Sequence, residues 1–154
     1  MEPTQHILCP VDFSQASDES FRYAVDLASR LGAEVHVLHV YQLPAYAFPD
    51  GALLPGAAWT TRILEAAQKE LNTFLMRFRD APVKLHHHLV EGTPHVEINR
   101  LANVLEAQLI VMGTHGRTGL AHLVMGSVAE RVVRSAERPV LTVRGGKAAR
   151  PRSQ

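Results

Sequence analysis

Five short apolar runs, rich in Val, Ile and Leu, alternate along the chain with four longer stretches of helical period. The first, second and fourth runs are nearly continuous, which is typical of parallel strands that are buried on both faces. The pattern therefore predicts five strands, at His6–Val11, Glu34–Val40, Val83–Val90, Gln108–Met112 and Pro139–Val143.

Between the strands, apolar residues recur three and four positions apart, so that each stretch has one apolar helical face. These faces lie within residues 21–31, 63–78, 98–105 and 129–136. Ser14 is expected to cap the first helix and Gly32 to close it, whereas Thr93 and Pro94 open the third. The order of strands and helices predicts an α/β fold, an open five-stranded parallel sheet with helices on both faces.

Composition limits the functions that the chain can have. With 154 residues, the chain is the size of one domain. Its formal charge of +1 is too small to attract nucleic acid or an acidic membrane surface strongly. A single cysteine, Cys9, excludes an internal disulfide framework and is expected to be a small buried hydrophobe. No secretory signal or apolar span is visible, so we expect a cytoplasmic protein.

Two segments fall outside the alternating pattern. Residues Tyr41–Ala58 are rich in Pro, Gly and Ala and are expected to form a long, mobile loop after the second strand. Residues 145–154 are expected to form a basic disordered tail, which leaves residues 1–144 as one domain.

Candidate chemistry lies after the strands, because ligands of such sheets bind at the carboxyl ends of the strands. After the fourth strand, Gly113, Gly116 and Gly119 allow positive φ angles and a close approach of backbone to a ligand. Gly126 and Ser127 then open a helix, whose free N–H groups favour a phosphate. Two anion sites in one strand–loop–helix unit suggest a polyphosphate, and the alternative is a flexible surface loop that ends in a helix.

The pattern Gly113-x-x-Gly116, nine residues, Gly126-Ser127 resembles the nucleotide-binding motif of the universal stress protein family. The similarity extends to residues 7–14 (ILCPVDFS), to Gly92-Thr93-Pro94 and to residues 138–143 (RPVLTV), and covers roughly residues 5–144. It implies the strand order 3-2-1-4-5 and the ATP-binding branch, because the other branch lacks the paired glycines and the serine.

The resemblance also implies a binding site for ATP, accompanied by Mg²⁺ or Mn²⁺ on the phosphates. Val40 would touch the base, Pro10 and Asp12 the adenosine end, and the glycine loop and last helix the ribose and phosphates. The implied nucleotide-binding residues are Pro10, Val11, Asp12, Val40, Met112, Gly113, Thr114, His115, Gly116, Arg117, Thr118, Gly119, Gly126, Ser127, Val128 and Ala129.

The motif leaves two functions open. We favour a nucleotide-dependent regulatory or sensor module of the stress response, because no catalytic base is evident. An unknown protein partner would bind according to the nucleotide state. A slow ATP hydrolase or phosphotransferase is the alternative, with His115, Asp12 and Ser127 the available groups. The Walker A, Gly-x-Gly-x-x-Gly, Gly-x-Ser-x-Gly and Ser-Gly-Gly-x-Asp-Ser motifs are absent from the sequence.

Several single residues have a second interpretation. Asp12 could simply cap a helix, and His115 and Arg117 could be exposed loop side chains rather than phosphate ligands. His86 and His88 share a strand face and could ligate zinc, but no Cys, Asp or Glu clusters beside them and no third ligand is identified. A polar face on an edge strand is the favoured interpretation of these histidines.

The last predicted strand bears on assembly. Residues Pro139–Val143 would form an edge strand that is apolar on both faces, and an unprotected edge of this kind tends to pair. We therefore expect a homodimer in which this strand pairs antiparallel with its copy across a two-fold axis, as the family resemblance also implies.

Overall fold

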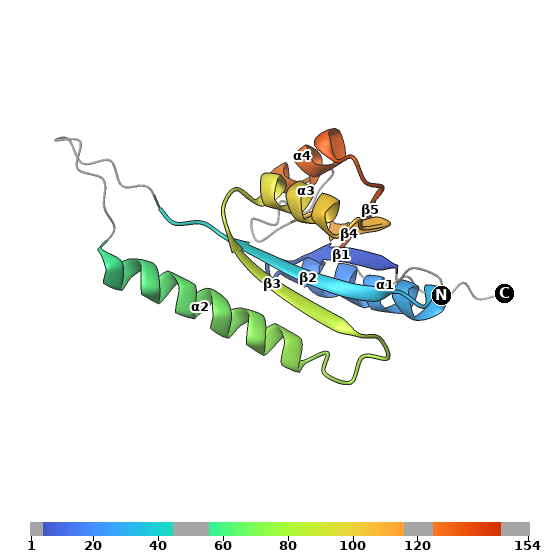
Figure 1. The fold of residues 1–154 in the computed structure, drawn as a ribbon, viewed down its shortest axis with the longest axis horizontal. Coiled ribbons are helices and arrows are strands. Elements are labelled where there is room, and N and C mark those ends of the chain that lie inside the picture. Colours follow the sequence, from blue (N-terminus) through green and yellow to red (C-terminus); the bar gives the residue numbers. More distant parts are fainter. Residues whose placement is uncertain (1–4, 45–55, 116–124, 146–154) are drawn as a thin grey trace.

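The computed structural model describes residues 5–44, 56–115 and 125–145. Within these ranges strands and helices alternate in the predicted order (Figure 1). The strands are β1 (His6–Pro10), β2 (Glu34–Tyr41), β3 (Leu85–Glu91), β4 (Leu109–Gly113) and β5 (Val140–Val143). The helices are α1 (Gln15–Leu31), α2 (Ala57–Met76), α3 (Pro94–Val104) and α4 (Ser127–Ser135).

The five strands form one sheet in the order β3-β2-β1-β4-β5, and every neighbouring pair is parallel. The predicted α/β fold and strand order are therefore confirmed. β2 and β3 lie on one side of β1, and β4 and β5, which follow later in the sequence, lie on its other side. This reversal next to β1 creates the switch point at which such sheets bind ligands.

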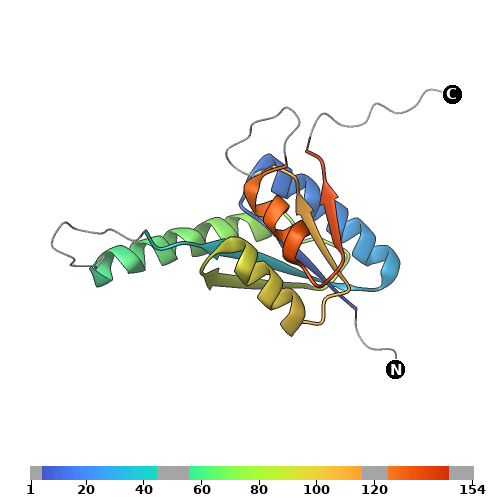
Figure 2. The same cartoon turned by 90° about the horizontal axis from the view of Figure 1, so that it is seen from above.

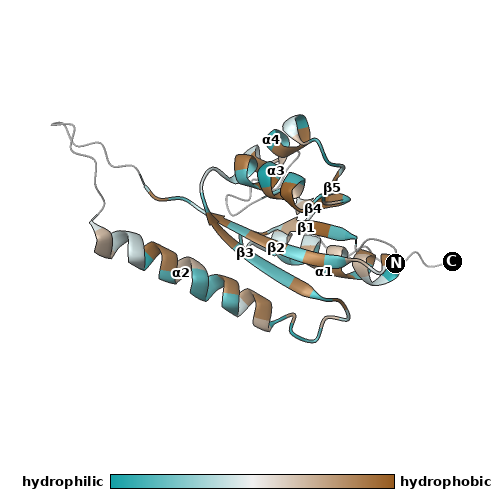
Figure 3. Ribbon diagram, viewed as in Figure 1, coloured by the Kyte–Doolittle hydropathy of each residue, from teal (hydrophilic) through white to brown (hydrophobic). Residues whose placement is uncertain are grey.

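The helices form two layers. Helices α1 and α2 cover one face of the sheet, and α3 and α4 lie side by side on the other (Figures 1 and 2). One core packs Phe21, Leu71 and Phe74 against β1 and β2, and the second packs Ile98 and Val132 against β1, β2 and β4. Hydrophobic and hydrophilic residues alternate along the helices in Figure 3, as expected for helices with one face in a core.

Local signals set the ends of the helices. The Ser14 hydroxyl accepts a hydrogen bond from Ser17 N at 3.3 Å, and Gly32 closes α1 with a φ of 66°, as predicted. Thr93 and Pro94 occupy the N-cap and first position of α3 as expected, but the Thr93 side chain makes no capping hydrogen bond. Backbone and side-chain signals together therefore explain why α1 and α3 begin where the strands before them end.

The predicted loop over Tyr41–Ala58 is wrong at both ends. Tyr41 closes β2, paired in register with Glu91 of β3, while Ala57 and Ala58 begin α2, in keeping with the high helix propensity of alanine. Residues 45–55, and residues 146–154 of the predicted tail, lie outside the described ranges. Within those ranges, no helix combines the length and apolarity needed to cross a bilayer.

Cys9 lies in the middle of β1, and the prediction that it is buried is confirmed. Desolvation by burial raises the pKa of its thiol to about 12, against a smaller lowering effect of a hydrogen bond with Ser20. The thiol is therefore protonated at neutral pH and is part of the core.

Candidate functional site

A cavity of about 420 Å³ opens at the carboxyl ends of β1, β2 and β4, next to the switch point of the sheet. Its volume falls within the range of about 300–1,000 Å³ that is usual for small-molecule sites. The described lining residues are Pro10, Val11, Asp12, Ser17, Leu38, Val40, Gln42, Pro94, Ile98, Met112, Gly113, Thr114, His115, Gly126, Ser127, Val128 and Ala129.

The cavity brings together the predicted site residues that the structure describes. They come from the end of β1, from Val40 in β2, from the end of β4 and from the start of α4. The remaining predicted residues, Gly116, Arg117, Thr118 and Gly119, lie outside the described residues. Segments that are far apart in the sequence thus meet at one end of the sheet.

Five lining residues were not anticipated from the sequence: Ser17, Leu38, Gln42, Pro94 and Ile98. Leu38 and Ile98 look like ordinary core residues in a sequence, and only the topology shows that they also form the cavity wall. For Ser17 and Pro94 a signal existed, since both stand in the first turn of a helix that follows a strand. The first turns of all such helices point to the same end of a parallel sheet.

One part of the cavity wall is apolar. Leu38, Val40, Ile98 and Met112 come from β2, α3 and β4 and belong to, or pack against, the second hydrophobic core. A wall of this kind favours a flat or aliphatic ligand group over a charged one.

Another part of the lining is formed by the N-terminus of α4. Gly126 is the N-cap residue, with φ of −60° and no side-chain capping bond, and its C=O accepts from Glu130 N at 2.9 Å. The first N–H groups of any helix lack partners within that helix. The residues that carry them, Ser127, Val128 and Ala129, line the cavity. The helix dipole adds positive potential there, so this end suits an anion.

Backbone hydrogen bonds hold this helix N-terminus against the sheet. Thr114 N donates to Val143 O at 3.0 Å, and Gly126 N donates to Thr114 O. The end of β4 is therefore tied to both β5 and the start of α4, which fixes the direction of the free N–H groups.

Gly113 is needed for a different reason from the one predicted. Its φ is not in the positive region, so that expectation is wrong for this glycine. A Cβ at this position would lie 3.0 Å from both Cβ and O of Ala16 in α1. The missing side chain therefore allows α1 to approach the end of β4 closely.

Asp12 is held by the first turn of α1. Its Oδ1 accepts from Ser17 Oγ at 2.7 Å, from Ser14 N at 3.0 Å and from the Ser14 hydroxyl, while Asp12 N donates to Ser17 Oγ at 2.8 Å. Ser14, not Asp12, is the N-cap residue. The carboxylate thus braces the capping serine and also lines the cavity.

The turn between β1 and α1 contains a strained residue. Phe13 has a φ of 64°, which is rare for a bulky side chain. Its ring packs 4.3 Å from the His39 ring and 5.8 Å from the Phe74 ring, measured between centroids. This packing holds Asp12 and Ser14 on either side in place.

His115 lines the cavity and has a buried ring nitrogen. Its Nδ1 lies 2.8 Å from the Thr114 hydroxyl, and its Nε2 has no hydrogen-bond partner among the described residues. A buried polar atom without a partner is costly, so it marks a position at which a ligand or water can bind. The described lining contains no Lys or Arg, and the positive potential comes from backbone N–H groups.

The histidines of β3 lie elsewhere, toward the amino ends of the strands. The expectation that no acidic residue stands beside them is wrong, because Glu34 of β2 places its Oε2 2.7 Å from His86 Nε2. β3 is an edge strand, as predicted. The neighbour could not be found by sequence proximity, since cross-strand pairing brings it there.

Both the sequence and the fold are similar to those of universal stress proteins. The model of the universal stress protein family matches residues 3–144. Universal stress protein MJ0531 of Methanocaldococcus jannaschii is 36% identical over 141 residues, covering 90% of this chain and 81% of that protein. The universal stress protein UspA of Lactobacillus plantarum superimposes with a TM-score of 0.77 at 27% identity, covering 94% of this chain and all of that one.

A third similar structure is the universal stress protein of Archaeoglobus fulgidus in complex with dAMP, with a TM-score of 0.55. At 23% identity, over 92% of this chain and 98% of that one, it bears on the fold alone. The family match spans nearly the whole chain, and the sheet order agrees with the one that the motif implied. The chain belongs to the universal stress protein family.

Proposed function

We propose that the cavity binds ATP and that the protein acts as a nucleotide-dependent regulatory module in the stress response. The observation that carries the proposal is the N-terminus of α4, which has no side-chain cap and lines a cavity that also has an apolar wall. An anion-binding end and an apolar end in one cavity match the two ends of a nucleotide.

The geometry suggests an orientation for the ligand. The base would lie against Val40 and its apolar neighbours, with Pro10 and Asp12 at the adenosine end. The phosphates would meet the N–H groups of Ser127, Val128 and Ala129, and the residues 116–119 would complete the site. Proteins of this fold include one solved with dAMP, and an adenine nucleotide is therefore the natural first ligand to test.

A divalent cation, Mg²⁺ or Mn²⁺, would accompany the triphosphate. Asp12 is the one carboxylate among the described lining residues, and its Oδ1 already accepts three hydrogen bonds. The phosphate oxygens and water would therefore supply most of the cation's ligands, which is usual for Mg²⁺.

A substitution at Ser127 tests the phosphate end. Ser127→Asp keeps the helix stable, because a carboxylate is favourable at a helix N-terminus, but it places negative charge where the phosphates would bind. Like charges about 4 Å apart near a protein surface repel by up to about 4 kcal/mol. Isothermal titration with Mg²⁺-ATP should therefore show a loss of about tenfold or more.

Ser127→Asn is the matched control, because it has nearly the same shape without the charge, and it should bind within a few-fold of the unchanged protein. Titration with ATP, ADP, AMP and adenosine should give affinities that fall in that order. The proposal is wrong if the unchanged protein does not bind ATP at millimolar ligand with Mg²⁺, or if the Asp and Asn variants bind equally.

Slow ATP hydrolysis is the second candidate, favoured by the unpaired Nε2 of His115 within the described site. Such a group can position an attacking water. Phosphate release followed over hours should then fall to the protein-free rate in His115→Asn while ATP binding is kept. Equal release by this variant would exclude the role of His115.

Homodimerisation through β5 and a cytoplasmic location belong to the same proposal. β5 is an edge strand, with all four residues half-buried in the single chain. An edge of this kind offers unpaired backbone groups to a second copy. We expect a protein partner to respond to the nucleotide, and we expect neither nucleic acid nor a membrane to bind.

A further inference from the structure

Four histidines and a glutamate gather on one face of β1, β2 and β3, near the amino ends of these strands. In the parallel register, His6 of β1 stands opposite Glu34 of β2, and His36 of β2 opposite His86 of β3. His88 lies two residues farther along β3, on the same face as His86. β3 is largely hydrophilic in colour in Figure 3. Strand pairing thus concentrates imidazoles that are scattered in the sequence.

The rings pack around His36, which is 5% exposed. The His86 ring stacks on it with centroids 4.4 Å apart and planes at 13°, and the His6 ring meets it edge-on at 4.9 Å. His6 and His86 are half-buried, and His86 keeps one-third of its side chain exposed. An ion in solution can therefore reach the rim of the cluster.

Three ligand atoms of this cluster converge. His6 Nδ1 lies 3.0 Å from His36 Nε2, and one potential ligand atom from each of His6, Glu34 and His36 lies within 4.8 Å of the other two. Two ligands of a tetrahedral zinc ion lie about 3.3 Å apart when each bond is about 2.0–2.1 Å long. The two imidazole nitrogens therefore already have nearly the required spacing, whereas the Glu34 carboxylate has to come closer to them.

The neighbouring side chains hold these ligands as metal sites require. His88 Nε2 lies 3.0 Å from His36 Nδ1, so a proton on Nδ1 can bond to His88 and leave the Nε2 lone pair for a metal. His86 and Lys84 donate to the Glu34 carboxylate at 2.7 and 3.2 Å. Hydrogen bonds of this kind orient metal ligands and fix the histidine tautomer.

The protonation states are also suitable. Burial, followed by the neighbouring histidines, lowers the pKa of His36 to about 4, and burial lowers that of His88. Hydrogen bonds from His86 and Lys84 lower the pKa of Glu34. Metal ligands must be neutral imidazole and ionised carboxylate, and the lowered pKa values of His36 and Glu34 favour these forms.

We propose that His6, Glu34 and His36 bind one Zn²⁺ ion or a similar divalent transition-metal ion, with His88 and His86 as outer-shell partners. Two imidazoles and one carboxylate favour transition metals over Mg²⁺, which prefers oxygen ligands. Coordination leaves at least one position open for water. When His6 binds through Nδ1, its proton is carried on Nε2, so that the ring stays neutral.

This site is separate from the nucleotide cavity and does not rest on it. His6 opens β1, whereas Pro10 at the other end of β1 lines the cavity. Four residues at about 3.3 Å each place the two ends about 13 Å apart. A metal on the nucleotide phosphates and a metal at His6 would therefore be different ions.

The alternative is a purely structural network in which the histidines bond only to one another. Isothermal titration of the tag-free, EDTA-treated full chain with Zn²⁺ distinguishes the two. Binding of one Zn²⁺ per chain is expected, and Mg²⁺ should neither bind there nor compete. Absence of Zn²⁺ binding at micromolar concentrations would overturn the proposal.

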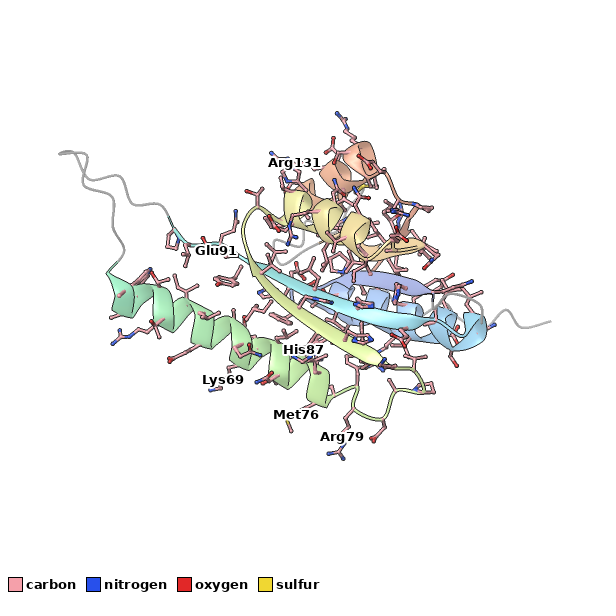
Figure 4. All side chains as sticks on the ribbon, in the orientation of Figure 1. Lys69, Met76, Arg79, His87, Glu91 and Arg131 are labelled. Carbon is pink, nitrogen blue, oxygen red and sulfur yellow. The ribbon has the colours of Figure 1, made fainter. Side chains whose placement is uncertain are left out.

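Substitutions assign the ion to this cluster. His6→Gln and Glu34→Gln, at the half-buried starts of their strands, should each weaken Zn²⁺ binding by more than tenfold, and His88→Gln by about 10–100-fold. His87→Gln is the matched control, because His87 is exposed on the opposite face of β3, toward α2 (Figure 4). Its Zn²⁺ affinity should be unchanged.

His36→Gln replaces a buried ring and can unfold the protein, so the test relies on the variants at positions 6 and 34. Circular dichroism should show that these fold like the unchanged chain. Equal loss of Zn²⁺ binding in His87→Gln, or no loss in His6→Gln and Glu34→Gln, would overturn the assignment. ATP titration serves as an independent control, since its result does not depend on this site.

Discussion

The replacement of Gly113 by alanine tests whether this glycine is required by packing. The new methyl group would lie 3.0 Å from Ala16 Cβ, 3.0 Å from Ala16 O and 3.2 Å from Ala16 C. Ordinary contacts are 3.4–4 Å, and a backbone carbonyl cannot rotate away as a flexible side chain could. The first turn of α1 must therefore shift away from the end of β4.

Inserting a methyl group into a well-packed site costs about 1–3 kcal/mol. Replacing glycine also removes freedom from the unfolded chain, which stabilises a protein by about 0.4–1 kcal/mol and hides part of this cost. Gly145→Ala is the control that largely cancels this second effect. Its Cβ would meet the same residue, Ala16, at 3.3 Å, where only a small adjustment is needed.

The measurement is thermal unfolding followed by circular dichroism. For a chain of this size, 1 kcal/mol corresponds to about 2–4 °C in Tm. Gly113→Ala should therefore melt about 2–12 °C below Gly145→Ala. Equal melting temperatures would refute the close approach of α1 to β4, and with it the packing role of Gly113.

Three further predictions concern other parts of the molecule. Ser17→Ala removes the hydrogen bonds that Ser17 Oγ makes with Asp12 N and Oδ1, and should lower the free energy of unfolding by about 1–3 kcal/mol in urea titrations and weaken ATP binding. Unchanged stability would contradict this role. The Cys9 thiol, with its pKa raised to about 12 by burial, should react with Ellman's reagent at pH 8 only after unfolding, and fast labelling of the native protein would exclude its burial. Thr142→Lys places a charge on the β5 edge and should convert the dimer into a monomer in sedimentation equilibrium. If the unchanged protein is itself a monomer, pairing through β5 is refuted.

The order of elements could be predicted because it depends on short-range patterns. Apolar runs and the helix signals Ser14, Gly32 and Pro94 act within a few residues, and they remained valid in the folded chain. The boundary of α2 was missed because Ala57 and Ala58 follow a segment rich in Pro and Gly, which suggested a loop. In the sequence, the nearby Pro and Gly residues are a stronger signal for a loop than the helix propensity of two alanines is for a helix.

The two proposed sites differ in how much of each can be predicted from the sequence. The N-terminus of α4 is a contiguous signal, so Gly126 and Ser127 could be identified from spacing alone. The pairing of Glu34 with His86 depends on the register of β2 and β3, which are separated by the whole of α2. A sequence without that register shows only two histidines with no third ligand, and the cross-strand neighbours become visible only in the fold.

The two sites also lie where the polarity of the fold favours them. In this alternation each helix runs opposite to the strands, so the N-termini of α1, α3 and α4 meet the carboxyl ends of the strands. Those ends carry partial positive charge and suit phosphate. The C-terminus of α1 leads through Gly32 to the start of β2, at which Glu34 stands, and helix C-termini carry partial negative charge. The same helices therefore favour an anion at the carboxyl ends of the strands and a cation at the amino ends. β1 contributes a residue to each proposed site, Pro10 at its carboxyl end and His6 at its amino end.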